Sequence, residues 1–322
     1  MLGDAPVIDA LVHGFGRSRT SHTAEEMVSV CFAESHTDIA AYHLVRRLGP
    51  MPEGARSQLE LGLRFRDVAG PGRVRVMAGL SNPYDTRRSI DELDELIDEH
   101  GVVGLELYPY GWEAPGIQQR GFLFDDEHVV FPLLEHVRNR GIGHVAVDMA
   151  VGHVGLAFGV AAFAVAVEAF PDVQFEVVPS GWDLPEDTAN LATRANVWIN
   201  LGGTSTLLES APRRFAEIMG KVLQAGGTGQ NAEDRILWGT GVMAVHSQFL
   251  LDMFWSFEMP HDLTDDCGHP ELTKRVKRKI LGENYARKFD LSLDELIGAI
   301  PDDDMRQAQL AGDLRSPWFG VR

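Results

Sequence analysis

The chain has 322 residues, of which 44% are hydrophobic and 24% are charged, the composition of an ordinary globular protein. Its formal net charge of −18 makes the surface repel phosphate backbones, which excludes nucleic acid as an expected partner. The two cysteines form no CxxC pair, so we expect neither a disulfide framework nor a zinc ribbon, and the reducing cytoplasm fits. We expect no signal peptide, and the longest apolar run, Val151–Val167, is too short and interrupted to span a membrane.

Residues Val7–His13 predict a short buried strand that delivers polar side chains at its C-terminal end. Side chains of a strand alternate between its faces, so we expect Asp9, Leu11 and His13 to point the same way. A carboxylate and an imidazole at the mouth of a barrel are typical first ligands of a metal-dependent hydrolase. Leu11, which lies between them, offers no ligand atom.

The next segment reads as helical. Residues 20–23 can cap a helix that starts at Ala24, and residues 38–45 continue the same pattern. Val28–Phe32 is an alternative short strand, because periodicity does not separate strand from helix in so short a run. Arg56–Val68 predicts a further helix that ends before a Gly-Pro-Gly turn.

From residue 74 onward a strand and a helix alternate six times. The predicted strands are Val74–Leu80, Val102–Tyr108, His144–Ala150, Val173–Val178, Val197–Leu201 and Ile236–Thr240. The predicted helices are Asp91–His100, His128–Arg140, Gly155–Phe170, Asp183–Arg194, Leu207–Ala225 and His246–Phe257. Such alternation predicts βα units with a parallel sheet.

With the first strand and Val28–Phe32 the count reaches eight, which predicts an α/β fold of the TIM-like (β/α)8 barrel type. An open doubly wound sheet is the rival, but the sequence has no glycine-rich phosphate turn of the GxGxxG or GxxxxGK[ST] type. We expect one domain over residues 1–322, with a C-terminal helical extension over Glu271–Ile280 and Asn284–Phe289.

In such a barrel the chemistry lies at the C-terminal ends of the strands. Asp9 and His13 end the first strand, and Asp148, followed by His153, ends the strand that starts at residue 144. His153 also fits a helix entry. Glu106 should point inward and form a structural ion pair with an arginine such as Arg17. His246 opens a helix, where we expect a cap or a surface position.

Five segments carry a family resemblance, in order along nearly the whole chain: Ile8–His13, Val103–Pro109, Phe170–Gly181, Arg235–Gly241 and Ile280–Ala286. They resemble the amidohydrolase superfamily, in the branch of aminocarboxymuconate-semialdehyde decarboxylase. The family patterns are a first strand Asp-x-His-x-His, a Gly-(Ile/Leu)-Lys-Leu strand, Phe-Pro-Asp leading into a strand that ends His-x-Gly, a strand that ends Gly-(Ser/Thr)-Asp, and a C-terminal helix entry. The resemblance implies an amidohydrolase-type barrel with a metal site at its mouth.

The same resemblance shows where this chain departs from the family. Leu11, Asp148 and Pro179 stand where the family has histidines, and Gly241 stands where it has its last aspartate, a ligand that also shuttles protons. A catalytic zinc or iron site needs about three protein ligands and an open position. The first interpretation is therefore a metal-deficient paralogue, an accessory subunit beside a metal-loaded homologue. In it, Asp9 and His13 hydrogen-bond each other or the backbone.

Two other interpretations stay open. A shifted mononuclear site could use His13 and Asp148, with Asp9, His153 or His246, to hold Zn, Fe or Mn for hydrolysis, decarboxylation or hydroxylation. A small-molecule binding protein could use the old pocket without metal. The chain also looks like the degenerate subunit of oxygenases that hydroxylate 2-aminoisobutyrate, where the dinuclear metal belongs to the other subunit. The expected partners are thus a paralogous subunit or a second copy, and a small-molecule substrate, with no nucleic acid and no membrane.

Overall fold

The computed structural model describes residues 5–14, 22–44, 52–80, 82–109, 112–114, 117–120, 122–148, 156–178, 185–225, 232–243 and 245–315. At 52–56, 112–114, 117–120, 148, 156–158 and 185 it describes the backbone without the side chain.

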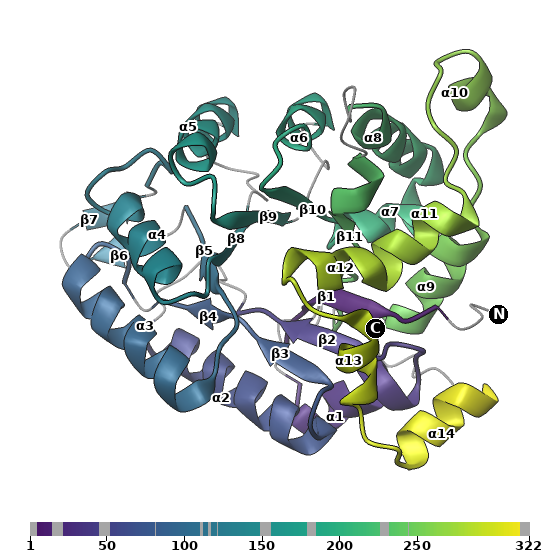
Figure 1. The fold of residues 1–322 in the computed structure, drawn as a ribbon, viewed down its shortest axis with the longest axis horizontal. Coiled ribbons are helices and arrows are strands. Elements are labelled where there is room, and N and C mark those ends of the chain that lie inside the picture. Colours follow the sequence, from purple (N-terminus) through teal and green to yellow (C-terminus); the bar gives the residue numbers. More distant parts are fainter. Residues whose placement is uncertain are drawn as a thin grey trace.

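The centre of the molecule is a ring of short parallel strands (Figure 1). These are β1 (Ile8–Val12), β2 (Ile39–Tyr42), β3 (Val74–Val76), β4 (Ala78–Gly79), β5 (Leu105–Leu107), β8 (His144–Asp148), β9 (Gln174–Val178), β10 (Val197–Asn200) and β11 (Ile236–Leu237). They pair in the orders β1-β2-β3 and β11-β10-β9-β8-β5-β4.

Backbone contacts join these two sheets into one barrel. On one side, β3 and β4 are consecutive parts of a single strand, separated by Met77. On the other side, Ala10 N donates to Trp238 O at 2.8 Å and Gly241 N donates to Leu11 O at 2.9 Å. The ring therefore contains eight strands, and the predicted (β/α)8 barrel is confirmed.

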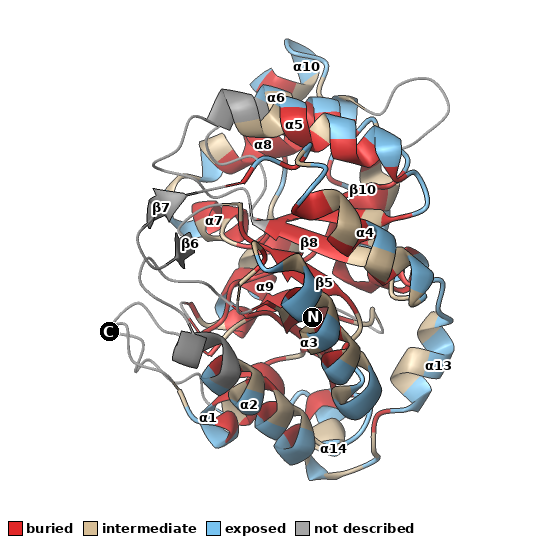
Figure 2. Cartoon of the chain, turned by 90° about the vertical axis from the view of Figure 1, so that its left-hand side faces the viewer, coloured by how far each residue is buried: buried red, intermediate tan, exposed pale blue. Residues whose placement is uncertain are grey.

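Helices surround this barrel and turn their exposed sides outward, while the strands are buried (Figure 2). The longer ones are α2 (Pro52–Ala69), α3 (Thr86–His100), α4 (Val130–Asn139), α5 (Leu156–Ala169), α8 (Pro212–Gln224) and α9 (Ser247–Ser256). The shorter ones are α1 (Ala24–Val28), α6 (Pro185–Leu191), α7 (Leu207–Ser210), α10 (His261–Asp265), α11 (Lys274–Arg278), α12 (Asn284–Lys288), α13 (Leu293–Gly298) and α14 (Asp304–Ala311). Short π or 3-10 turns are η1 (Ser29–Ala33), η2 (Thr204–Thr206), η3 (Ala232–Arg235) and η4 (Lys279–Glu283), and β6 (Trp112–Ala114) pairs antiparallel with β7 (Ile117–Arg120).

Glycines end two helices where the sequence predicted it. Gly101 follows α3 with φ 62° and Gly141 comes just after α4 with φ 73°, a left-handed conformation that glycine adopts without strain. In the described part of the chain, none of the helices has the length and apolar character needed to cross a membrane.

The eighth strand lies elsewhere than expected. Residues 39–42 form β2, so the helix predicted over residues 38–45 is wrong, and Val28–Phe32 belongs to the end of α1 and to η1 rather than to a strand. All four residues of β2 are buried. Ala40 and Tyr42 pack in the large core under the helices, while Ile39 and Ala41 pack in a second cluster inside the barrel. A strand buried on both faces shows no polar alternation.

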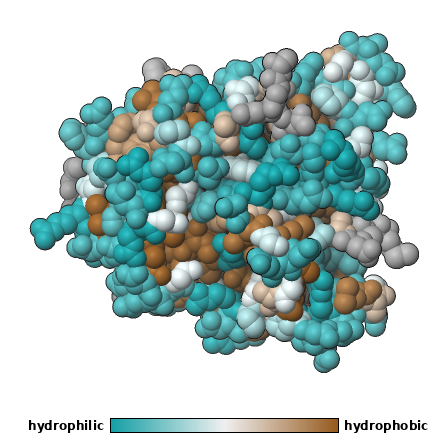
Figure 3. All heavy atoms as spheres, in the orientation of Figure 1, coloured by the Kyte–Doolittle hydropathy of each residue, from teal (hydrophilic) through white to brown (hydrophobic). Residues whose placement is uncertain are grey.

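The surface that Figure 3 shows is mostly hydrophilic, with apolar atoms gathered in the middle of this face, over the barrel strands. At the end of the barrel near α13, the partly buried Val103, Leu293, Leu296 and Ile297 pack against the inner cluster. These four side chains extend the inner cluster toward the surface at this end of the barrel.

Candidate functional site

The first polar group inside the barrel is Glu106 on β5. Its neighbours Leu105 and Leu107 pack in the outer core, so Glu106 points inward as predicted. Its Oε1 lies 3.3 Å from His43 Nδ1 and 3.0 Å from the Tyr108 hydroxyl. The predicted structural ion pair is therefore present, but its described partner is a histidine rather than an arginine, and Arg17 lies outside the described residues.

His43, at the end of β2, was not singled out from the sequence. Burial alone would lower the pKa of its imidazole, but the charge and hydrogen bond of Glu106, with the charge of Glu176, together outweigh burial and the pKa is raised from its usual value. Both side chains of this pair are almost fully buried. The sequence signal for His43 was the same as for His13, because each ends an apolar run.

A second buried ion pair, between Lys288 and Glu176, lies at the end of the barrel that α12 covers. Lys288, the last residue of α12, donates to Glu176 on β9, and Asn200 on β10 also donates to Glu176. Burial alone would raise the pKa of Glu176, but the charges of Lys288 and His43, with the hydrogen bonds from Lys288 and Asn200, together outweigh burial and the pKa is lowered. Tyr285 and Phe289 pack beside Lys288 in the inner cluster. This end of the barrel, filled by α12, is called the floor below.

The carboxylate of Asp9 joins β1 to the segment that follows β11. Its Oδ1 accepts hydrogen bonds from Thr240 N at 3.0 Å and from Leu11 N at 3.2 Å, and its Oδ2 accepts one from the Thr240 hydroxyl at 2.5 Å. The pairing of β1 with β2 is irregular between Asp9 and Val12, and the consecutive residues Ala10 and Leu11 both pack in inner clusters. The alternation therefore fails here, and Asp9 does not share the face of Leu11.

The pKa of Asp9 is raised from 3.8 to about 6, because burial outweighs the hydrogen bonds from Thr240 and Leu11. We name Asp9, His43, Glu106, Glu176 and Lys288, with the partly buried Arg75 that acts on Lys288, the interior charge cluster. His43 also acts on Asp9, and Glu176 and Lys288 both act on His43, so these groups share one electrostatic environment.

Asp9→Asn should change how stability depends on pH. The carboxyl binds its proton more tightly in the folded protein, so its contribution to stability is fully present below about pH 4 and is lost as pH rises through about 6. The asparagine variant has no carboxyl group to ionise at this position, so its stability does not fall in this way as the pH rises. Relative to the wild type it should gain about 2 kcal/mol in free energy of unfolding between pH 4 and pH 7.

Urea unfolding of both proteins at several pH values measures this difference. The asparagine oxygen can still accept from Thr240 N and Leu11 N, so the fold should persist. Parallel stability curves for the two proteins would contradict a raised pKa at Asp9.

An apolar plug inside the barrel is formed by Leu11, Met77, Ala146 and Val178, with the partly buried Val103 packed against it. Leu11 is 8% exposed and packs so tightly that a Cβ on Gly202 would lie 2.1 Å from its Cδ2. By the sequence resemblance, Leu11 of this plug stands where the family has the first histidine of its metal site.

Gly241 lies beside His13 at the same mouth. A Cβ at this position would be 3.7 Å from His13 Nε2, so a side chain here would meet the imidazole, as the resemblance implies for the family's aspartate. Gly241 has φ 70°, a conformation that strains an aspartate. An aspartate at this position would therefore be strained.

The other predicted site residues are only partly placed. Asp148 ends β8 opposite Val178, but its side chain lies outside the described residues, as do His153 and Pro179. His246 stands at the N-cap position of α9, as expected, and its Nε2 lies 3.1 Å from Glu34 Oε2, so it is a paired side chain rather than a surface one.

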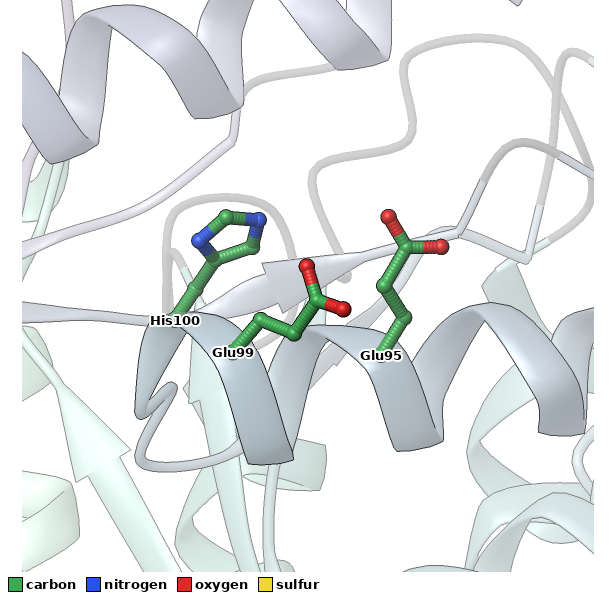
Figure 4. Close-up of side chains that lie close together, drawn as sticks. All are labelled: Glu95, Glu99 and His100. Carbon is green, nitrogen blue, oxygen red and sulfur yellow. The ribbon is translucent and has the colours of Figure 1, made fainter.

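One cluster of ligand-type residues lies away from the mouth. Glu95, Glu99 and His100 project from the last turns of α3, with ligand atoms within 4.8 Å of one another (Figure 4). The two glutamates are exposed, and α3 ends where the chain turns back to start β5. Exposed acidic groups of this kind are common on helices without any metal, and nothing else on the described surface points to an ion here.

The described donors at the mouth do not fit a transition metal. Leu11 and Gly241 offer no ligand atom, and both oxygens of Asp9 already accept hydrogen bonds from Thr240. Among the residues whose side chains are described, His13 is thus the single ligand retained at the mouth, whereas a zinc or iron site needs about three.

Comparisons with known proteins identify the family. A search of the curated proteins found no match. Among solved structures, 2,6-dihydroxybenzoate decarboxylase from Rhizobium is similar with a TM-score of 0.55 and 14% identity, over 88% of this chain and 98% of that one. 5-Carboxyvanillate decarboxylase from Novosphingobium aromaticivorans, solved with bound manganese, gives 0.57 and 12%, over 89% and 98%. Dihydroorotase from Campylobacter jejuni gives 0.52 and 13%, over 89% and 84%.

At these identities the likeness to solved structures is one of fold. The sequence itself gives the family, because the model of the amidohydrolase family matches residues 63–291, more than half of the chain. The chain belongs to the amidohydrolase family.

Proposed function

We propose that this chain is a metal-ligand-deficient amidohydrolase-fold subunit, the accessory partner of a metal-loaded paralogue in an enzyme complex. The observation that carries this proposal is the apolar plug, because a leucine packed against Met77, Ala146 and Val178 fills the place of a metal ligand. The glycine conformation at Gly241 supports it independently.

The architecture that this implies is a pair of unequal subunits. One supplies the metal centre, and this one keeps the barrel and supports its partner. Oxygenases that hydroxylate the small amino acid 2-aminoisobutyrate are built in this way, and the present chain resembles their degenerate subunit. The reaction and the dinuclear metal then belong to the partner, and the substrate is a small molecule.

Elemental analysis of the purified chain tests this proposal. We expect far less than one transition metal per chain, and no change in metal content in a His13→Ala variant. A metal-loaded homologue expressed with the chain should co-purify with it and carry the metal. About one metal per chain, lost in His13→Ala, would overturn the accessory role and favour a metal site of this chain's own.

The alternative is an independent metal-dependent hydrolase or decarboxylase with a shifted mononuclear site. It draws support from the partial exposure of His13 at the mouth and from the manganese bound in the structurally similar 5-carboxyvanillate decarboxylase. The ligands would be His13 and Asp148, with Asp9 or His153, and the metal would be Zn, Fe or Mn. Asp9 would have to give up Thr240 to take part.

A further inference from the structure

Arg75 on β3 has no carboxylate partner in the described part of the chain. Its neighbours Val74 and Val76 pack in the outer core, so Arg75 points into the barrel. Its guanidinium lies over the Phe289 ring, with Cζ 4.6 Å from the ring centre, and its buried Nε has no acceptor among the described residues. A buried N–H of a charged group is costly to leave without an acceptor.

The carboxylates of the interior charge cluster bind other groups. Two of them face bases, Glu176 with Lys288 and Glu106 with His43, and the third already accepts hydrogen bonds from the backbone and from a hydroxyl. Arg75 instead lies close to another cation: burial lowers the pKa of Lys288, and the charge of Arg75 lowers it further. An anion beside Arg75 would offset this repulsion and accept from its Nε.

Two neutral polar groups at the floor also lack partners among the described residues. The Tyr285 hydroxyl is 2% exposed, and Nδ1 of His144 is buried. Their rings lie 4.8 Å and 4.1 Å from the same Phe289 ring that Arg75 covers. Burial, with the charges of Lys288 and Arg75, lowers the pKa of His144 to about 3, so its imidazole is neutral at pH 7. A hydroxyl and a neutral imidazole can each donate one hydrogen bond.

Solvent reaches this group of side chains from the outside of the floor. Arg75 and His144 are both partly exposed, although both lie at the inner side of their strands. Apolar atoms gather on this face of the molecule (Figure 3). The partly buried aliphatic side chains at this end come from the chain before β5 and from α13, and they are Val103, Leu293, Leu296 and Ile297. One unpaired cation with an apolar border fits a singly charged carboxylate that carries an alkyl group.

We propose that Arg75 binds the carboxylate of a small aliphatic acid at the floor of the barrel. The guanidinium donates to the carboxylate from Nε and from one of its terminal nitrogens, and the Tyr285 hydroxyl donates a further hydrogen bond. The alkyl group of the acid lies along Val103 and α13. The site lies at the end of the barrel away from His13 and Gly241, so it stands whether or not the accessory role of the chain holds.

Thermal unfolding at pH 7 with hexanoate tests the proposal. Sodium hexanoate should raise the Tm in a saturable way, because it binds the folded state alone. Hexanamide keeps the alkyl chain but lacks the charge, and sodium chloride matches the ionic strength, so neither should give a saturable shift. Arg75→Gln should weaken hexanoate binding by about tenfold or more, because a charged two-point contact is replaced by a neutral one.

Arg138→Gln is the matched control. Arg138 also lies over a phenylalanine ring, that of Phe170, with Cζ 5.5 Å from the ring centre, but it has carboxylate partners in Glu135 and Asp172. Its loss should leave hexanoate binding unchanged. Equal shifts with hexanoate and hexanamide in the wild type would overturn the proposal, as would the absence of any saturable shift, and neither result depends on a variant that folds. Unchanged binding in a folded Arg75→Gln protein would overturn it as well.

Discussion

Lys288→Met should lower the free energy of unfolding by about 3–5 kcal/mol, because it leaves a carboxylate uncompensated inside the barrel. Glu176 is 1% exposed, and Lys288 is its only described cationic partner in an ion pair. Methionine keeps most of the volume of the lysine stem, so lost charge pairing, not a cavity, dominates the effect. Urea unfolding at pH 7 measures it.

The double variant Lys288→Met with Glu176→Gln is the control. It removes both charges and keeps an amide oxygen to accept from Asn200, so it should recover most of the lost stability. A loss below about 1 kcal/mol in the single variant would mean that the pair behaves like an exposed ion pair.

Leu11→His should destabilise the protein by about 2–3 kcal/mol and still give no metal centre. The substitution restores a family ligand but buries an imidazole against Met77, Ala146 and Val178, where none of the side chains can pair with it. Pro179 and Gly241 still offer no side-chain donor, and among the described side chains only His13 would join the new histidine, so the set stays short of about three. Unfolding in urea and elemental analysis after zinc exposure measure the two effects.

Leu11→Met is the matched control, because it conserves volume and polarity and should cost less than about 1.5 kcal/mol. Stoichiometric zinc in the Leu11→His protein would mean that His13 and a side chain outside the described residues already converge on this point. The accessory interpretation would then lose its main support.

Most of the barrel could be predicted from the sequence, because each βα unit carries a strong local signal. An apolar run followed by a periodic helix that ends at glycine, as at Gly101 and Gly141, locates an element without knowledge of its neighbours. The strand β2 was missed, because Ile39–Tyr42 is short and buried on both faces and so shows no alternation.

That one error also hid a site residue. With residues 38–45 read as a helix, His43 had no reason to stand at a strand end, and Glu106 was left to pair with an arginine. The inward direction of Glu106 followed from alternation along β5, but its partner depended on which strand lay two places away. Glu176 and Lys288 are 112 residues apart and meet only in the closed fold. The sequence around either residue therefore does not predict their pairing.

The floor has a consequence for how the protein is made. Glu176 lies in the middle of the chain, and the lysine that neutralises it comes 112 residues later, on α12. During synthesis the strands up to β11 emerge before α12, so the nascent barrel carries a buried acid without its base and an open lower end. The barrel therefore completes its core only when the chain past residue 288 has left the ribosome, and a chain cut before α12 would lack both the counter-charge and the aromatic rings that close the floor.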